Sequence, residues 1–182
     1  MVKWLALLRG INVSGQKSIR MVELRSWMED LGFASVATYI QTGNVVFTSA
    51  ERSGKKLAQQ IHEQILKRSG FEVPVVIRTE AQMRSISRNN PFQAEAELDG
   101  KSVHVAFLSA KPKAEGLEKM AAADSGEDRF ESIGKEIYLH FPHGSADTKL
   151  WNSTMERKLG VAATGRNWKT VVKLNEMLKQ VQ

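Results

Sequence analysis

The order in which strand-like and helix-like patterns follow one another most constrains the fold of this chain of 182 residues. Residues 3–11 form its most apolar run, and such a near-continuous pattern is typical of a strand buried on both faces. A helix, two strands, a second helix and a further strand are predicted over residues 20–31, 36–41, 44–48, 55–68 and 73–78. This βαββαβ order is that of the ferredoxin-like fold.

Capping residues mark where the helices of this first half begin and end. Ser18 is expected to cap the first helix, and Gly32 and Gly70 are expected to end the first and second helices in the left-handed conformation. Thr79 and Gln82 have the spacing of a capping box, which predicts a short helix at this point of the chain.

The same order begins again after a polar connector over residues 94–101. A strand, a helix, a hairpin of two strands and a helix ending at Gly160 are predicted over residues 103–107, 112–123, 129–133, 136–141 and 148–159. A final helix over residues 167–181 is an addition to this repeat. We therefore expect an α+β fold of two similar ferredoxin-like βαββα units with mainly antiparallel sheets, divided into residues 1–79 and 80–182.

The composition excludes some classes of function but does not identify one. A net charge of +6 permits binding to nucleic acid, nucleotides or acidic surfaces. The chain contains no cysteine, which excludes disulfides, thiolate nucleophiles and zinc–thiolate sites. Arg9 interrupts the first apolar run, which is too short for a signal peptide or a membrane span. We expect a soluble, cytoplasmic protein with no membrane partner.

A polar stretch over residues 164–170 is difficult to explain by folding alone, and it is predicted to be a turn that opens the last helix. The first amides of a helix lack partners, and the helix dipole adds partial positive charge, so such a turn attracts anions. We expect Arg166 and Asn167 to contact an anionic ligand there. Trp168 either packs as the first apolar residue of its helix or stacks on a ligand base.

A second set of polar residues is expected at one edge of the first sheet. In the ferredoxin-like topology, the end of the first strand and the turn of the first hairpin lie at the same end of the sheet. Arg9, Asn12, Gln41 and Asn44 should therefore meet beside glycines that let a ligand approach the backbone. The alternative is that Asn44 serves only the turn and that Arg9 pairs with a nearby carboxylate.

The two polar sets are predicted to frame one cleft. Arg9 and Arg166 would repel each other at low dielectric unless they share an anion. The final helix is therefore expected to begin near the end of the first strand, with Trp168 as a wall of the cleft. The expected ligand contacts come from Arg9, Asn12, Gln41, Asn44, Lys149, Arg166, Asn167 and Trp168.

Three motifs occur in order along the chain: LLRGINV over residues 7–13, YIQTGNVVF over residues 39–47 and TGRNWKT over residues 164–170. Together they resemble the DUF1697 family, a bacterial domain of unknown function, over essentially the whole chain. The resemblance implies a two-part α+β fold and supplies no activity. Thr148 and Met155 depart from the commoner residues, and Gly165 stands where the family often has threonine, so that hydroxyl is missing here.

Other chemistries find little support. His140 and His143, with Asp147 beyond, lack a recognised metal-ligand spacing, so we expect no metal site. There is no Gly-x-Ser-x-Gly, Walker A or Gly-x-Gly-x-x-Gly motif, and no cofactor is identified. Whether the protein catalyses a reaction stays open.

Three functions compete at this stage. The first is binding of a small anionic, phosphate-bearing or nucleotide-like ligand by the residues above. The second, which is less favoured, is a nucleic-acid-binding module that uses the same basic surface with strong salt dependence. The third is an interaction module whose motifs only hold its two halves together.

Overall fold

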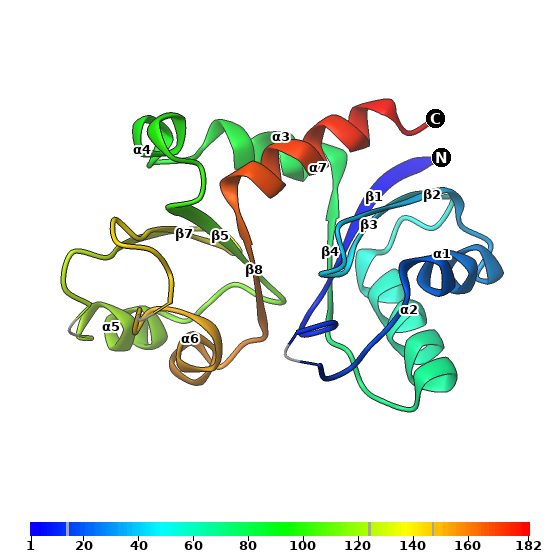
Figure 1. Cartoon of the computed structure of the whole chain (residues 1–182), viewed down its shortest axis with the longest axis horizontal. Coiled ribbons are helices and arrows are strands. Elements are labelled where there is room, and N and C mark those ends of the chain that lie inside the picture. Colours follow the sequence, from blue (N-terminus) through cyan, green and yellow to red (C-terminus); the bar gives the residue numbers. More distant parts are fainter. Residues whose placement is uncertain (14, 124, 147) are drawn as a thin grey trace. The chain divides into compact units, whose positions relative to one another are not determined.

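The structure is a computed structural model that describes residues 1–13, 15–123, 125–146 and 148–182. The chain divides into two compact units (Figure 1): unit 1 consists of Met1–Ser85 and Lys173–Gln182, and unit 2 of Ile86–Val172. Each unit contains a four-stranded antiparallel sheet with helices. The prediction of an α+β fold with two similar units is confirmed.

Unit 1 has the predicted βαββαβ order. Its elements are β1 (Val2–Leu8), α1 (Met21–Asp30), β2 (Ala34–Tyr39), β3 (Asn44–Ser49), α2 (Gly54–Ser69), β4 (Val75–Thr79) and the beginning of α3 (Glu80–Arg88). The sheet order is β2-β3-β1-β4, with β1 antiparallel to both neighbours. This central place explains the continuous apolar run, because residues 4–8 are all buried.

Helices α1 and α2 cover one face of this sheet (Figure 1). Five of the residues whose helical spacing predicted these elements are buried, namely Leu24 and Met28 of α1 and Leu57, Ile61 and Ile65 of α2, whereas Leu66 of α2, also predicted to face inward, is 38% exposed. The positions of the core residues therefore agree with the pattern in the sequence.

Unit 2 repeats this arrangement with one helix added at its start. Its elements are α4 (Gln93–Leu98), β5 (Val103–Leu108), α5 (Ala114–Ala121), β6 (Arg129–Ile133), β7 (Glu136–His140), α6 (Asn152–Leu159), β8 (Ala163–Asn167) and the beginning of α7 (Trp168–Gln180). The sheet order is β6-β7-β5-β8, which matches unit 1 strand for strand. The core between this sheet and helices α5 and α6 includes Ala106, Leu139, Met120 and Met155.

The predicted turn over residues 164–167 is wrong, because these residues belong to strand β8, which pairs antiparallel with β5. The sequence of this strand, ATGRN, contains a glycine and no valine, isoleucine or large aromatic residue, so local propensity argues against a strand. Pairing with β5 supplies the ladder hydrogen bonds that local propensity does not predict. Unit 2 is thus a complete βαββαβ unit followed by a helix.

The predicted polar connector over residues 94–101 is also different in the structure. Its first part forms the short helix α4, in which only Ala96 is buried. With one buried position, the segment lacks the apolar periodicity from which a helix can be recognised.

Helices α3 and α7 each belong to both units. Helix α3 begins in unit 1 and ends in unit 2, where the Tyr138 hydroxyl donates a hydrogen bond to the Ile86 carbonyl at 2.9 Å. Helix α7 begins in unit 2 and ends in unit 1, where the Lys3 ammonium donates to the Lys179 carbonyl at 3.2 Å. The observed division therefore lies inside α3 rather than after residue 79, and the last ten residues belong with unit 1.

The helix ends follow most of the capping predictions. Gly70 and Gly160 end α2 and α6 in the left-handed conformation. The capping box is present, since the Thr79 amide donates to Gln82 Oε1 at 2.8 Å and the Gln82 amide donates to Thr79 Oγ1 at 3.2 Å. Ser18 is not the cap of α1, because the helix begins later and Arg20 occupies the cap position.

Candidate functional site

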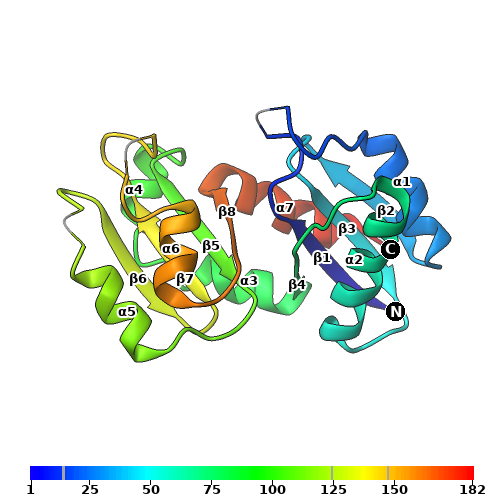
Figure 2. The same cartoon turned by 90° about the horizontal axis from the view of Figure 1, so that it is seen from below.

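The Asn12 side chain joins two loops at one end of the unit 1 sheet. Its Nδ2 donates hydrogen bonds to the carbonyls of Ile19 (2.9 Å) and Gln41 (2.7 Å), and its Oδ1 accepts one from the Ile19 amide (2.9 Å). The loop between β1 and α1 is thereby tied to the turn between β2 and β3 (Figure 2). The motifs around Arg9 and Gln41 meet at this end, which we call the Asn12 edge: residues 9–13, 15–20 and 40–44.

Gly43 and Asn44 are explained largely by the tight turn between β2 and β3. Asn44 is fully buried, and its Nδ2 donates to the Tyr39 carbonyl (3.0 Å) and to Thr42 Oγ1 (3.1 Å). Gly43 has a φ of +79°, and a Cβ there would lie 2.6 Å from Leu8 Cβ. Asn44 therefore shapes this edge from within rather than presenting an amide to solvent.

The four residues predicted at this edge differ in exposure, since Gln41 is exposed, Asn44 is buried, and Arg9 and Asn12 are half-buried. The Gln41 side chain is exposed, and the bond from Asn12 goes to the Gln41 backbone carbonyl. Arg9 is half-buried, and its amide donates to the Pro74 carbonyl at 3.0 Å. Two further cations lie in the same loop: Lys17 donates to the Glu72 carbonyl (2.7 Å), and Arg20 forms an ion pair with Glu23 (2.7 Å) that raises the Arg20 pKa.

The backbone of the Asn12 edge is strained. Within the described residues, four non-glycine residues have positive φ, and three of them lie here: Asn12 (54°), Lys17 (49°) and Ile40 (47°). Asparagine tolerates this conformation, whereas a β-branched residue such as isoleucine is a clear outlier. Strain of this kind concentrates at functional sites, where the surrounding structure imposes it.

In unit 2, Arg166 is a buried strand residue rather than a residue of an exposed turn. It faces Val105 across the ladder and is 9% exposed. Its Nη1 donates to Thr164 Oγ1 (3.1 Å) and to the Gly165 carbonyl (2.8 Å). Burial lowers its pKa to about 10, so the guanidinium remains charged at neutral pH.

The start of α7 is capped by the protein itself. Asn167 Oδ1 accepts a hydrogen bond from the Thr170 amide at 2.9 Å, and the Lys169 amide donates to the Gly100 carbonyl at 3.4 Å. Two of the first amides of this helix therefore have partners. These two amides are therefore not open to an anion.

Sequence reasoning missed a counterpart of Arg166 in unit 1. Arg78 lies on β4 opposite Leu5, is 5% exposed, and donates its Nη1 to the carbonyl of the preceding residue at 2.8 Å, as Arg166 does. Each arginine is followed by the residue that caps the next helix, Thr79 or Asn167. An arginine directly before a capping residue, in both halves of the chain, is the signal that could have identified this pair.

The other two residues predicted in the second motif differ in exposure. Trp168 is 6% exposed, which agrees with its alternative role as a packed helix residue, whereas Lys149 is exposed on the surface of unit 2. Arg9 belongs to unit 1 and Arg166 to unit 2. The expected convergence of these two groups on one ligand stays a prediction.

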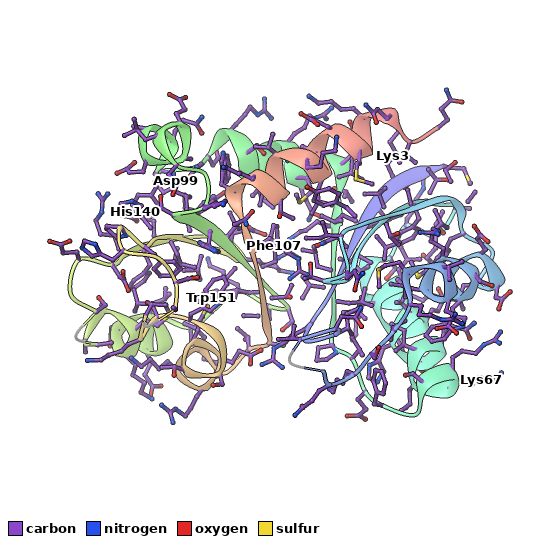
Figure 3. The ribbon with its side chains drawn as sticks, viewed as in Figure 1. Lys3, Lys67, Asp99, Phe107, His140 and Trp151 are labelled. Atoms are coloured by element: carbon purple, nitrogen blue, oxygen red, sulfur yellow. The ribbon has the colours of Figure 1, made fainter. Side chains whose placement is uncertain are left out.

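The histidines of unit 2 are engaged in packing and ion pairing. His140, labelled in Figure 3, lies with Nδ1 3.0 Å from Arg129 Nη2, while His143 forms an ion pair with Glu127. Asp147 lies outside the described residues. The part of the chain that the structure describes contains no group of three or more metal-ligating His, Cys, Asp or Glu side chains.

None of the helices in the described ranges is both long and apolar enough to cross a lipid bilayer.

Comparison with known proteins identifies a family of unknown function and a solved structure with a similar fold. A family model described as "Protein of unknown function (DUF1697)" matches residues 1–138. The solved structure of the conserved bacterial protein SP0830 from Streptococcus pneumoniae is similar, with a TM-score of 0.76 and 22% identity, over 97% of this chain and 98% of that chain. No curated protein matches the chain. The structural similarity concerns the fold alone.

Proposed function

Because the chain belongs to the DUF1697 family, whose function is unknown, we propose a function from its own residues: unit 1 binds a small phosphate-bearing anion at the Asn12 edge. In this proposal Asn12 and Asn44 hold the edge in shape, and Arg9 and Gln41 contact the ligand. The division of roles follows from the hydrogen bonds of the two asparagines and from the exposure of Gln41.

The strained backbone is the observation that carries the proposal. A left-handed conformation costs a non-glycine residue about 1–2 kcal/mol, and Asn12, Lys17 and Ile40 all adopt it within one edge. The turn itself does not require isoleucine at this position, since glycine or asparagine would adopt the same left-handed conformation at a lower free-energy cost. A rigid, strained edge is what a preformed ligand site needs.

The charges of the edge suit a phosphate. A guanidinium presents a planar fork of N–H donors that matches two phosphate oxygens. Lys17 and Arg20, which contact the Glu72 carbonyl and Glu23, add positive charge in the same loop. Their contribution is to raise the local potential that attracts an anion, and Arg9 provides the specific contact.

Binding is tested by thermal shift and calorimetry with inorganic phosphate, pyrophosphate and a panel of phosphorylated metabolites, against sodium chloride at equal ionic strength. Arg9→Gln is expected to weaken phosphate binding by roughly 10- to 100-fold, because a charge-assisted hydrogen bond contributes about 1.5–3 kcal/mol. The melting temperature of the variant should remain close to that of the unaltered protein.

Lys55→Gln is the matched control, since it removes the same charge from an exposed residue near the start of α2. Helix α2 starts after β3, whose last residue pairs with the first residue of β1, so Lys55 lies at the end of the sheet away from Arg9. Its affinity should stay within about twofold. The proposal fails if no anion stabilises the protein above the salt control, or if both variants weaken binding equally.

A further inference from the structure

The Asn12 edge and the adjoining first turn of α1 expose aliphatic side chains as well as cations. Val13, Val22 and Ile40 are 53%, 58% and 48% exposed. We call these three residues the aliphatic rim. Single exposed aliphatic residues are common on protein surfaces, but three beside one strained, cationic loop form a distinct chemical surface.

Hydrogen bonds relate the rim residues to the chain around Gln41, directly for Val13 and Ile40 and through Arg25 for Val22. Val13 follows Asn12 and Ile40 precedes Gln41, and the Asn12–Gln41 bond of 2.7 Å joins these two chain segments. Val22 lies one helical turn before Arg25, whose Nη1 donates to Thr38 Oγ1 at 2.8 Å.

The directions of α1 and β2 bring Val22 to the same end. The two elements are joined by a short connection and run in opposite directions. Moving back along α1 from Arg25 to Val22 therefore leads the same way as moving forward along β2 from Thr38 to Ile40. The rim lies at the end of the sheet where Gln41 is exposed.

A free phosphate would gain no binding free energy from contact with the aliphatic rim. Phosphate is strongly hydrated and gains nothing from aliphatic side chains, whereas an apolar surface attached to it would cover them and release water. Ile40 supports this reading most strongly, because its side chain is presented to solvent from a left-handed backbone. The ligand therefore carries an apolar body beside its phosphate.

The Gln41 side chain indicates which chemical group forms the apolar part of the ligand. A carboxamide offers a donor and an acceptor in one plane, and it pairs in two-point fashion with the edge of a nucleobase, such as the N6 and N7 atoms of adenine. A nucleobase also has flat apolar faces that can lie on valine and isoleucine. Sugar phosphates lack the flat face, and alkyl phosphates lack the polar edge.

We infer that the ligand of the Asn12 edge is a nucleoside phosphate whose base lies on the aliphatic rim, pairs with the Gln41 carboxamide and directs its phosphate to Arg9. This inference rests on the proposed function, because it uses Arg9 as the phosphate contact. It goes further by naming the class of ligand and by assigning roles to Val13, Val22 and Ile40.

The test compares ligands that share the phosphate and differ in the body attached to it. Calorimetry with inorganic phosphate, ribose 5-phosphate and the four common ribonucleoside monophosphates should show at least one nucleotide binding tenfold or more tightly than ribose 5-phosphate. Inorganic phosphate should bind no more tightly than ribose 5-phosphate.

Two variants separate the base contacts from the phosphate contact. Ile40→Gly should fold at least as well as the unaltered protein, because glycine favours the observed φ of 47°. It should weaken nucleotide binding about three- to tenfold more than it weakens inorganic phosphate binding. Gln41→Leu should reduce the preference among the four bases.

Leu98→Ala is the matched control for loss of an exposed aliphatic side chain, since Leu98 is 90% exposed in unit 2. It should leave all affinities unchanged. Equal binding of ribose 5-phosphate and the nucleotides would overturn the inference while leaving the anion proposal standing, and no binding of any anion would remove both. Tighter, steeply salt-dependent binding of a polynucleotide than of any mononucleotide would also overturn it.

Discussion

His104 should make the stability of unit 2 fall in mild acid. Its ring lies on β5 against the rings of Trp151 and Phe141, at centroid distances of 5.2 and 5.3 Å, and Trp151 is labelled in Figure 3. Its Nδ1 is buried and has no hydrogen-bond partner within the described residues. Burial lowers the pKa of His104 from 6.5 to about 4, although a hydrogen bond with the Ser102 backbone opposes the shift.

The direction and size of the effect follow from the two pKa values. The unfolded chain protonates this histidine near pH 6.5, whereas the folded protein resists protonation down to about pH 4. Protons therefore favour the unfolded state, and the stability that His104 preserves at neutral pH is lost as the pH falls from 6.5 toward 4. Between pH 7.5 and pH 5 the loss is about 2 kcal/mol.

Urea unfolding at pH 7.5 and pH 5, followed by circular dichroism, should show that His104→Phe loses about 2 kcal/mol less than the unaltered protein over this interval. His143→Phe is the control, because His143 is an exposed residue in an ion pair with Glu127, and it should keep the full pH dependence. The imidazole NMR signals of His104 should titrate near pH 4. Titration near pH 6.5, or equal losses in the protein with and without His104, would refute this account.

Two further predictions concern the packing of single residues. Gly165→Ala should destabilise unit 2 by about 1–3 kcal/mol in urea unfolding, because an added Cβ would overlap the Trp151 ring. Adding Trp151→Leu to this variant should recover part of the lost stability. Asn12→Gly keeps the left-handed backbone but removes three hydrogen bonds, so the free energy of unfolding should fall by about 1–3 kcal/mol. The Ile19 amide should also exchange its hydrogen with solvent faster. An unchanged exchange rate at Ile19 would contradict the role of Asn12 in joining the two loops.

Part of the candidate site could be predicted from the sequence because it depends on strand direction. The end of the first strand and the turn of the first hairpin were expected at one end of the sheet, and the Asn12–Gln41 hydrogen bond joins them there. The sequence left open whether Asn44 serves a ligand or only the turn, and the internal hydrogen bonds of Asn12 were not predicted. An asparagine beside a glycine has the same pattern whether its amide faces a ligand or closes a turn.

The βαββα order repeated in both halves, the buried first strand, the left-handed glycines at the ends of α2 and α6, and the capping box at Thr79 were determined by the sequence alone. Each depends on interactions between residues a few positions apart, or on a periodicity that burial imposes on one segment. These features are therefore visible in a single sequence.

Only the tertiary structure decided the last strand, the burial of Arg166 and the sharing of α3 and α7 between the units. The residues of β8 have weak strand propensity, and their conformation is fixed by hydrogen bonds to β5, about sixty residues earlier in the chain. Gly165 is required there because the Trp151 ring occupies the place of a side chain. Partners so distant in sequence leave no local pattern, so an arginine that resembles a surface cation can be a buried strand residue.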